Sequence, residues 1–279
     1  MDEPGYARPP GGHPGQSELL TGRAVFTDQY LVIPHDVMRD IVAGHLPHWE
    51  KSRHWTLARP MSGFFETFSH YVVETGPGGG SDNPEPDPEV ESVLFLTHGK
   101  CVVELDGRPA KLTPGGYVYI AAGCRWTLRA FGQETSVFHW IRKRYEAVAG
   151  LAKPESFVSS EDEAKPEAMP DSDERWSTVR FVDPEDLRHD MHVNLVEFEP
   201  GAKIPFLETH VMEHGIYILQ GRAAYRLNQD WVEVEAGDFI GLRAFCPQAC
   251  CAAGPGKFRY LLYKDVNRHA GFGRTDVSG

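Results

Sequence analysis

Several features that would assign this chain of 279 residues to a special class are missing from it. The five cysteines are odd in number and irregularly spaced, so they do not form the framework of a disulfide-rich secreted domain. No apolar run approaches the roughly 18 residues of a membrane-spanning helix. The first residues also lack the basic and then apolar pattern of a signal peptide. We therefore expect a cytoplasmic protein with reduced thiols and no membrane partner.

Basic residues are too few for a nucleic-acid-binding surface. The chain has 28 Lys and Arg residues against 40 Asp and Glu residues, which gives a formal net charge of −12. No basic stripe offsets this charge, so we expect no nucleic-acid partner. With 41% hydrophobic and 11% aromatic residues the chain can bury a large core, and its length suits two domains.

Helical periodicity is scarce as well. The best helical candidate is PHDVMRDIVAGHL, residues 34–46. Both halves of the chain instead hold short runs rich in Val, Ile, Tyr and Phe, such as SVLFLTHG and GIYILQG, separated by Gly, Pro, Asn and Asp. This pattern predicts an all-β protein made of sandwiches or small barrels.

The two β-rich halves read as copies of one another. An offset of 122 residues places Gly99 on Gly221, Gly115 on Gly237 and Cys124 on Cys246 without gaps. We interpret this order of strands, turns and glycines as a duplicated β-barrel.

Composition divides the chain into four parts. Residues 1–20 are rich in Gly and Pro and are expected to form a flexible N-terminal arm. Residues 146–175 are charged, contain several prolines and hold few apolar residues, which predicts a solvated linker. We expect an N-terminal barrel over residues 21–145 and a C-terminal barrel over residues 176–279.

Ligand-type side chains gather in the short stretch ETHVMEH, which contains Glu208, His210, Glu213 and His214. On a helix, the last three would match the inverted zinc-protease pattern. A proline just before the stretch and a glycine with the β-rich run IYIL just after it leave no room for that helix. On a strand, side chains alternate between faces, so Glu208, His210 and His214 share one face while Glu213 points away. We interpret the stretch as a strand.

Two imidazoles and one carboxylate pointing into an apolar barrel predict a metal site, because unpaired buried charge is costly. A lone histidine on a barrel wall would more often be a hydrogen-bonded core residue. Nitrogen and oxygen donors with few competing thiolates favour a divalent ion such as Mn, Fe, Ni or Zn. Cys250 and Cys251 are close in sequence to this site, and we expect them to be small buried hydrophobes.

The glycine, glutamate and histidine spacing that begins at Gly201, followed by AGDFIGLRAFCPQ, resembles the two cupin motifs. The usual cupin order is His-x-His, then Glu, then a later His. Here Glu208 takes the first His place, His214 the Glu place and Gln248 the last His place. This permuted set resembles the bicupin (S)-ureidoglycine aminohydrolases, and the resemblance extends over most of the chain, including ARPMSGFFETFSHY.

The resemblance implies a bicupin fold of two tandem double-stranded β-helix (jelly-roll) barrels with few short helices. It implies hydrolysis of (S)-2-ureidoglycine, a small ureide, to (S)-ureidoglycolate and ammonia in the breakdown of purines and allantoin. The implied cofactor is Mn(II), with Fe, Ni or Zn as alternatives. Family habit and the barrel edges suggest a homo-oligomer, a dimer or larger.

The resemblance also implies a role for each site residue. The implied metal ligands are Glu208, His210, His214 and Gln248. Substrate contacts fall on Glu208, Gln248, Tyr260 and Lys264, with Glu208 and Lys264 as the catalytic residues. Tyr260 and Lys264 have the same parity, so on one strand both would face the barrel interior.

Two other functions remain open at this stage. One is a cupin dioxygenase or isomerase acting on a small carboxylate, and the other is a ligand-binding cupin without catalysis. No helix pair typical of a DNA-binding domain accompanies the barrels, which disfavours a regulator.

The first barrel lacks the ligand set. The offset of 122 residues places Pro86, Pro88, Ser92 and Trp126 on the four ligand positions, and only the serine is even a weak ligand. We therefore expect a metal-free first barrel, with Trp126 filling the space of the metal, that serves structural support or assembly.

Overall fold

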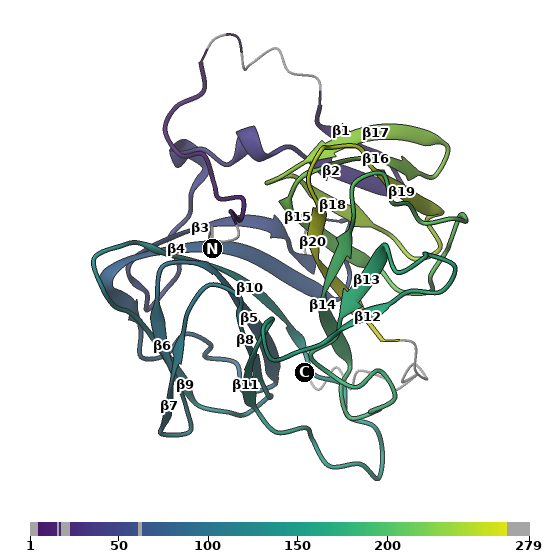
Figure 1. The fold of residues 1–279 in the computed structure, drawn as a ribbon. Coiled ribbons are helices and arrows are strands. Elements are labelled where there is room, and N and C mark those ends of the chain that lie inside the picture. The colour runs from purple at the N-terminus through teal and green to yellow at the C-terminus, as the bar shows by residue number, and fades with distance from the viewer. Residues whose placement is uncertain (1–4, 16, 18–22, 61–62, 267–279) are drawn as a thin grey trace.

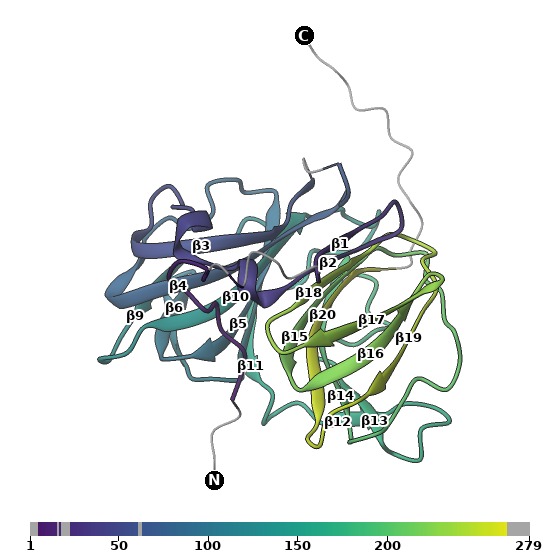
Figure 2. The same ribbon diagram turned by 90° about the horizontal axis from the view of Figure 1, so that it is seen from above.

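The chain folds into two β-barrels that lie side by side (Figure 1; Figure 2). The computed structural model describes residues 5–15, 17, 23–60 and 63–266. Within these residues there is no α-helix, and the strands form sheets of nine, eight and three strands. The prediction of an all-β fold with two barrels is confirmed. The helix expected over residues 34–46 is wrong, since this segment forms only the short 3-10 turns η2 (His35–Val37) and η3 (Asp40–Val42).

The nine-stranded sheet closes on itself to form the first barrel. Its strands in spatial order are β11 (Phe157–Ser160), β8 (Gly116–Ile120), β5 (Val90–His98), β10 (Ser136–Arg144), β4 (Phe68–Ser81), β9 (Trp126–Ala130), β6 (Cys101–Leu105) and β7 (Arg108–Leu112), with β3 (Glu50–Ala58) paired to β4. The long strand β4 pairs with β10 over most of its length and with β9 at its end. It therefore joins the two walls of this barrel.

The other two sheets face each other as the walls of the second barrel. The eight-stranded sheet has the order β1 (Val25–Phe26), β2 (Tyr30–Ile33), β18 (Phe239–Leu242), β15 (His214–Gln220), β20 (Phe258–Asp265), β14 (Met191–Phe198), β13 (Trp176–Val179) and β12 (Pro166–Ala168). The three-stranded sheet has the order β17 (Asp230–Glu235), β16 (Arg222–Leu227) and β19 (Gln248–Ala252).

Strands from outside the predicted domain limits complete both barrels. β2 precedes the first barrel in sequence but pairs antiparallel with β18 of the second, so residues 25–33 belong to the second barrel's sheet. The expected linker over residues 146–175 contains β11, which pairs with β8, and β12, which pairs with β13. Both additions cover sheet edges that would otherwise expose unpaired backbone groups. Composition does not reveal which strand covers which edge.

The described part of the N-terminal arm is packed against both barrels. Tyr6 is buried, and its ring contacts Phe95 of the first barrel with centroids 5.9 Å apart. The Ala7 backbone amide donates to the Leu219 carbonyl of the second barrel at 2.8 Å. The expectation of a flexible arm over residues 1–20 is wrong for this segment, because an aromatic side chain anchors it. The rest of the arm lies partly outside the described residues.

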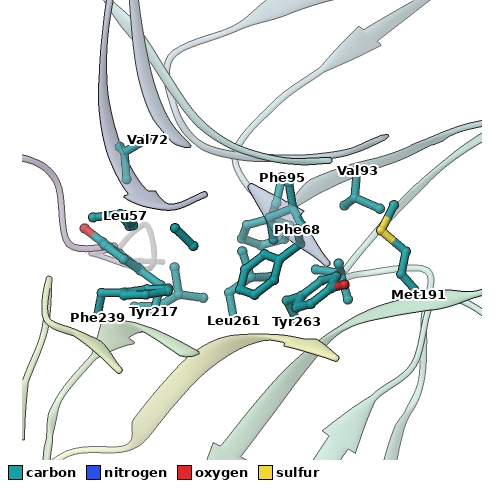
Figure 3. Close-up of a cluster of buried hydrophobic side chains, with 14 of the residues drawn as sticks. Leu57, Phe68, Val72, Val93, Phe95, Met191, Tyr217, Phe239, Leu261 and Tyr263 are labelled. Atoms are coloured by element: carbon teal, nitrogen blue, oxygen red, sulfur yellow. The ribbon is translucent and has the colours of Figure 1, made fainter. Parts of the chain in front are cut away.

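Buried apolar side chains form three cores. One fills the first barrel, one fills the second, and the third lies between the two barrels. Figure 3 shows the third core, in which Phe68, Val72 and Phe95 of the first barrel meet Tyr217 and other residues of the second. Face-to-face packing of two sheets therefore joins the barrels.

Two glycines bring this interface close to the second barrel's sheet. Gly215 on β15 pairs with Gly241 on β18. A Cβ atom built on Gly215 would lie 2.7 Å from Phe68, and one on Gly241 would lie 2.4 Å from Phe65. Phe68 has little room to move, because its ring stacks on Tyr263 with centroids 3.8 Å apart. The absence of a side chain at position 215 therefore allows the aromatic rings to pack.

We expect Gly215→Ala to lower the free energy of unfolding by about 1–3 kcal/mol, because the added methyl group overpacks the interface. Urea denaturation followed by fluorescence would measure the loss. Gly256→Ala is the matched control, since a Cβ atom there would meet nothing within 4 Å. Equal stability of the two variants would contradict the tight packing at Phe68.

Candidate active site

The stretch that carries the predicted ligands is only partly a strand. A strand was predicted from Glu208 onward, but β15 begins only at His214 and residues 209–213 are irregular. Glu208 is held instead by an isolated bridge to Gln248, with N–H···O distances of 3.0 Å and 2.8 Å in the two directions. The Phe245 amide adds a third backbone bond, to the His210 carbonyl at 2.6 Å. Backbone hydrogen bonds therefore position Glu208 and His210, whereas we expected a regular strand to position them.

Glu213 points away from the barrel interior, as predicted. Its carboxylate accepts hydrogen bonds from the backbone amides of Glu66, at 3.0 Å, and Thr67, at 2.7 Å. Both donors belong to the segment just before β4 of the first barrel. Glu213 therefore ties the start of β15 to the neighbouring barrel and is not part of the candidate site.

The ligand candidates lie close together at one end of the second barrel. Glu208 Oε1 lies 3.5 Å from His210 Nε2, and the rings of His210 and His214 stack with centroids 4.9 Å apart. His214 Nδ1 lies 3.1 Å from the Met212 carbonyl. When Nδ1 donates a hydrogen bond to this carbonyl, the tautomer is fixed and Nε2 keeps a free lone pair, as is common for metal-binding histidines.

The chemistry of this donor set fits a divalent metal. Gln248 Oε1 is buried and has no hydrogen-bond partner in the described structure, so a cation would satisfy it. Two imidazoles, a carboxylate and an amide oxygen are suitable ligands for Mn, Fe, Ni or Zn. No three His, Cys, Asp or Glu side chains within the described ranges already converge as a metal cluster.

Tyr260 and Lys264 lie on the inner face of β20, as their parity predicts. Tyr260 is buried in the core of the second barrel. Lys264 lies directly opposite His214 on β15 in the strand register. Burial, and secondarily the charge of Arg180, lower the pKa of Lys264, while the Glu208 carboxylate opposes that shift. A candidate ammonium thus lies within electrostatic reach of the ligand candidates.

Burial sets the protonation states of the other site residues. It lowers the pKa of His214 to about 3, with smaller effects from His210 and Lys264, so the imidazole is neutral at physiological pH. Burial likewise raises the pKa of Tyr260 well above its usual range. Its hydroxyl therefore keeps its proton and can act as a hydrogen-bond donor.

The sequence interpretation missed His192. This histidine lies on β14 directly opposite Lys264, on the other side from His214. The alternation in MHVNLVEF places it on the same face as Val196 and Phe198, which belong to the barrel core. That signal was present in the sequence, but nothing local indicated that β14 pairs with β20.

Cys250 is buried in the core of the second barrel, which confirms its expected role as a small apolar residue. Burial raises the pKa of its thiol well above the usual range. Cys251 is partly buried, and all five cysteines are free.

Aromatic rings fill the corresponding space in the first barrel. Trp126, the counterpart of Gln248, is buried and contacts Trp140 with centroids 5.8 Å apart and Trp49 at 6.4 Å. The Trp140 indole donates to the hydroxyl of Ser92, the counterpart of His214, at 3.0 Å. The first barrel has therefore replaced a polar interior with packed indoles.

Comparison with known proteins agrees with this architecture. Residues 194–263 match the cupin domain family and residues 63–145 match the EutQ-like cupin domain family. The prediction of a bicupin fold is confirmed. No helix in the described part of the chain is long and apolar enough to cross a membrane.

Related proteins indicate the activity. The chain is 30% identical over 258 residues to the (S)-ureidoglycine aminohydrolase of Escherichia coli (strain K12), which covers 91% of this chain and 95% of the relative. It is 29% identical over 226 residues to the Arabidopsis thaliana enzyme of the same name, covering 80% and 72%. Its fold matches a Pseudomonas aeruginosa protein described as glyoxylate-induced, with a TM-score of 0.90 and 59% identity over 96% of this chain and 98% of that chain. The chain therefore belongs to the (S)-ureidoglycine aminohydrolase family of enzymes.

Proposed function

We propose that this enzyme hydrolyses (S)-2-ureidoglycine to (S)-ureidoglycolate and ammonia with a divalent metal, Mn(II) in the first place, and that it acts in the cytoplasm as a homo-oligomer. The observation that carries the proposal is the grouping of Glu208, His210 and His214 beside the buried amide of Gln248, with Lys264 directly opposite His214. The identity to two enzymes named for this reaction supports the same substrate.

A metal bound by Glu208, His210, His214 and Gln248 would orient the substrate and withdraw electron density from its polar groups. The protein itself contributes binding and positioning. Lys264 is the residue that pairs with the substrate carboxylate, because its side chain is partly buried and lies opposite the ligand candidate His214. The protonated hydroxyl of Tyr260 would donate a second hydrogen bond to the same ligand.

The reaction exchanges one bond at the carbon between the ureido nitrogen and the carboxylate. The bond to the amino group breaks, a bond to a water oxygen forms, and one proton passes from that water to the departing amine. The Glu208 carboxylate is the proposed proton carrier, since it lies among the ligand candidates, with its Oε1 3.5 Å from His210 Nε2. Carrying a single proton from water to amine leaves Glu208 unchanged after each turnover.

The test of this function is the release of ammonia from freshly prepared ureidoglycine. Because ureidoglycine decays spontaneously, we expect the decisive result to be the chirality of the product. The enzyme should give (S)-ureidoglycolate, whereas the uncatalysed reaction gives both enantiomers. Racemic product at the uncatalysed rate would refute the proposal. Oxygen uptake with a small carboxylate would favour a dioxygenase, and tight binding without turnover would favour a binding protein.

We expect His210→Ala and His214→Ala each to remove both the metal and the activity, because each deletes one of two imidazole donors. Elemental analysis of purified protein should find about one divalent ion per wild-type chain and almost none in the variants. His98→Ala in the first barrel is the control, since His98 pairs only loosely with Glu134, at 3.8 Å. Full metal content in His210→Ala would show that the ligand assignment is wrong.

We also expect the first barrel to bind no metal. An anomalous-scattering peak within residues 22–145 would refute a metal-free first barrel.

Lys264→Met should keep the metal and lower kcat/KM by about two orders of magnitude, because a buried carboxylate loses its charge partner. Tyr260→Phe should lose about tenfold, as for one hydrogen bond. Lys257→Met is the matched control, since Lys257 lies just before the same strand and pairs with the surface residues Glu197 and Glu199. An unchanged kcat/KM for Lys264→Met would make Lys264 an ordinary structural lysine.

A further inference from the structure

A row of polar side chains crosses the inner face of the second barrel's sheet. The register of β15, β20 and β14 places His214 opposite Lys264, and Lys264 opposite His192. Side chains directly opposite each other in antiparallel strands have Cβ atoms about 5 Å apart. His192 therefore lies next to Lys264 on the side away from the ligand candidate His214.

A cavity of about 150 Å³ borders this row. Its lining includes His192, Lys264, Met212, His189 and Leu187. The metal-ligand candidates do not line the cavity, but two lining residues lie next to one of them: Lys264 is opposite His214 in the strand register, and the Met212 carbonyl lies 3.1 Å from His214 Nδ1. Its volume equals that of roughly five water molecules in the liquid, which suits a small organic acid.

His192 lines this cavity and has an unsatisfied ring nitrogen. The residue is 5% exposed, and its Nε2 atom is buried without a hydrogen-bond partner among the described residues. Buried polar atoms in folded proteins are rarely left unpaired, because losing their hydrogen bonds to water is costly. The orphaned atom therefore indicates a ligand that completes the site.

The charges around His192 determine which chemical groups a ligand of this site must carry. Burial, with help from Lys264, His189 and Arg180, lowers the pKa of His192 to about 4, while the charge of Asp183 opposes the shift. The ring is therefore neutral at physiological pH and has one nitrogen with a free lone pair. Because the ammonium of Lys264 only donates, the two residues together suit one molecule with a carboxylate and an N–H group close to each other.

We propose that His192 is a specificity-determining residue whose Nε2 accepts a hydrogen bond from the terminal NH2 of the substrate's ureido group, while Lys264 holds the carboxylate. This assignment rests on the proposed function, which supplies a substrate that has both groups. A hydrogen-bond acceptor at this position would distinguish a ureide, which has a terminal NH2 group, from an amide of the same shape, which has a methyl group there.

Two isosteric probes test the assignment on the metal-loaded enzyme. N-carbamoylglycine carries the ureido NH2, whereas N-acetylglycine has a methyl group in its place, and neither has an amino group to lose. We expect wild-type enzyme to bind N-carbamoylglycine about tenfold more tightly by calorimetry. His192→Leu should abolish this preference by weakening N-carbamoylglycine alone, and His192→Gln, which keeps an acceptor, should retain part of it. His98→Leu is the control and should bind both probes as the wild type does.

Turnover gives a second readout. His192→Leu should raise KM for ureidoglycine about tenfold with a smaller effect on kcat, because the bond is made in the ground state and the transition state alike. Its metal content should stay at the wild-type value. Equal affinity of wild-type enzyme for the two probes would refute the role of His192 even if His192→Leu does not fold. Failure of the proposed function would appear separately, as absence of stereospecific ammonia release by the wild type.

Discussion

The period-two alternation of side chains along the eight-stranded sheet is the constraint on which the rest of the structure depends. Each central strand of that sheet serves two cores at once. On β20, Leu261 and Tyr263 pack into the core between the barrels, while Tyr260 and Lys264 face the second barrel's interior. A shift of one residue in register would exchange the two sets and bury Lys264 among aromatic rings. The interface and the candidate site therefore fix each other's register.

This shared wall gives the first barrel a role in positioning the site. Glu213 precedes the ligand candidate His214, and its carboxylate is held by backbone amides of the first barrel. Tyr263 precedes Lys264, and its hydroxyl lies 2.9 Å from that of Thr67 in the first barrel. Two site residues thus follow directly after residues that are anchored across the interface. The first barrel can anchor these residues without having metal ligands of its own.

The features of the fold and of the candidate site that could be predicted from the sequence are those that depend on short-range interactions along the chain. Alternation within one strand predicted that Tyr260 and Lys264 share a face, because this depends only on local geometry. Glu213 points away from the interior, as expected, but it lies outside the strand and is held by hydrogen bonds to the first barrel. The pairing of β2 with β18 and the position of His192 beside Lys264 were not predictable, since both depend on contacts between distant segments. The bridge between Glu208 and Gln248 is also long-range, and it replaced an expected strand.

The two barrels of this duplicated fold have different roles, because one has an interior suited to ligand binding and the other a packed aromatic interior. In the second barrel, the position of Gln248 keeps a polar atom without a partner, which is costly unless a ligand satisfies it. In the first, Trp126 occupies the matching position and packs with other indoles, which stabilises the barrel but offers no oxygen ligand at that position. A binding site and a well-packed core make opposite demands on the same interior positions. With two copies, one barrel can supply the packing that holds the shared wall in place, while the other keeps the unsatisfied polar groups that binding requires.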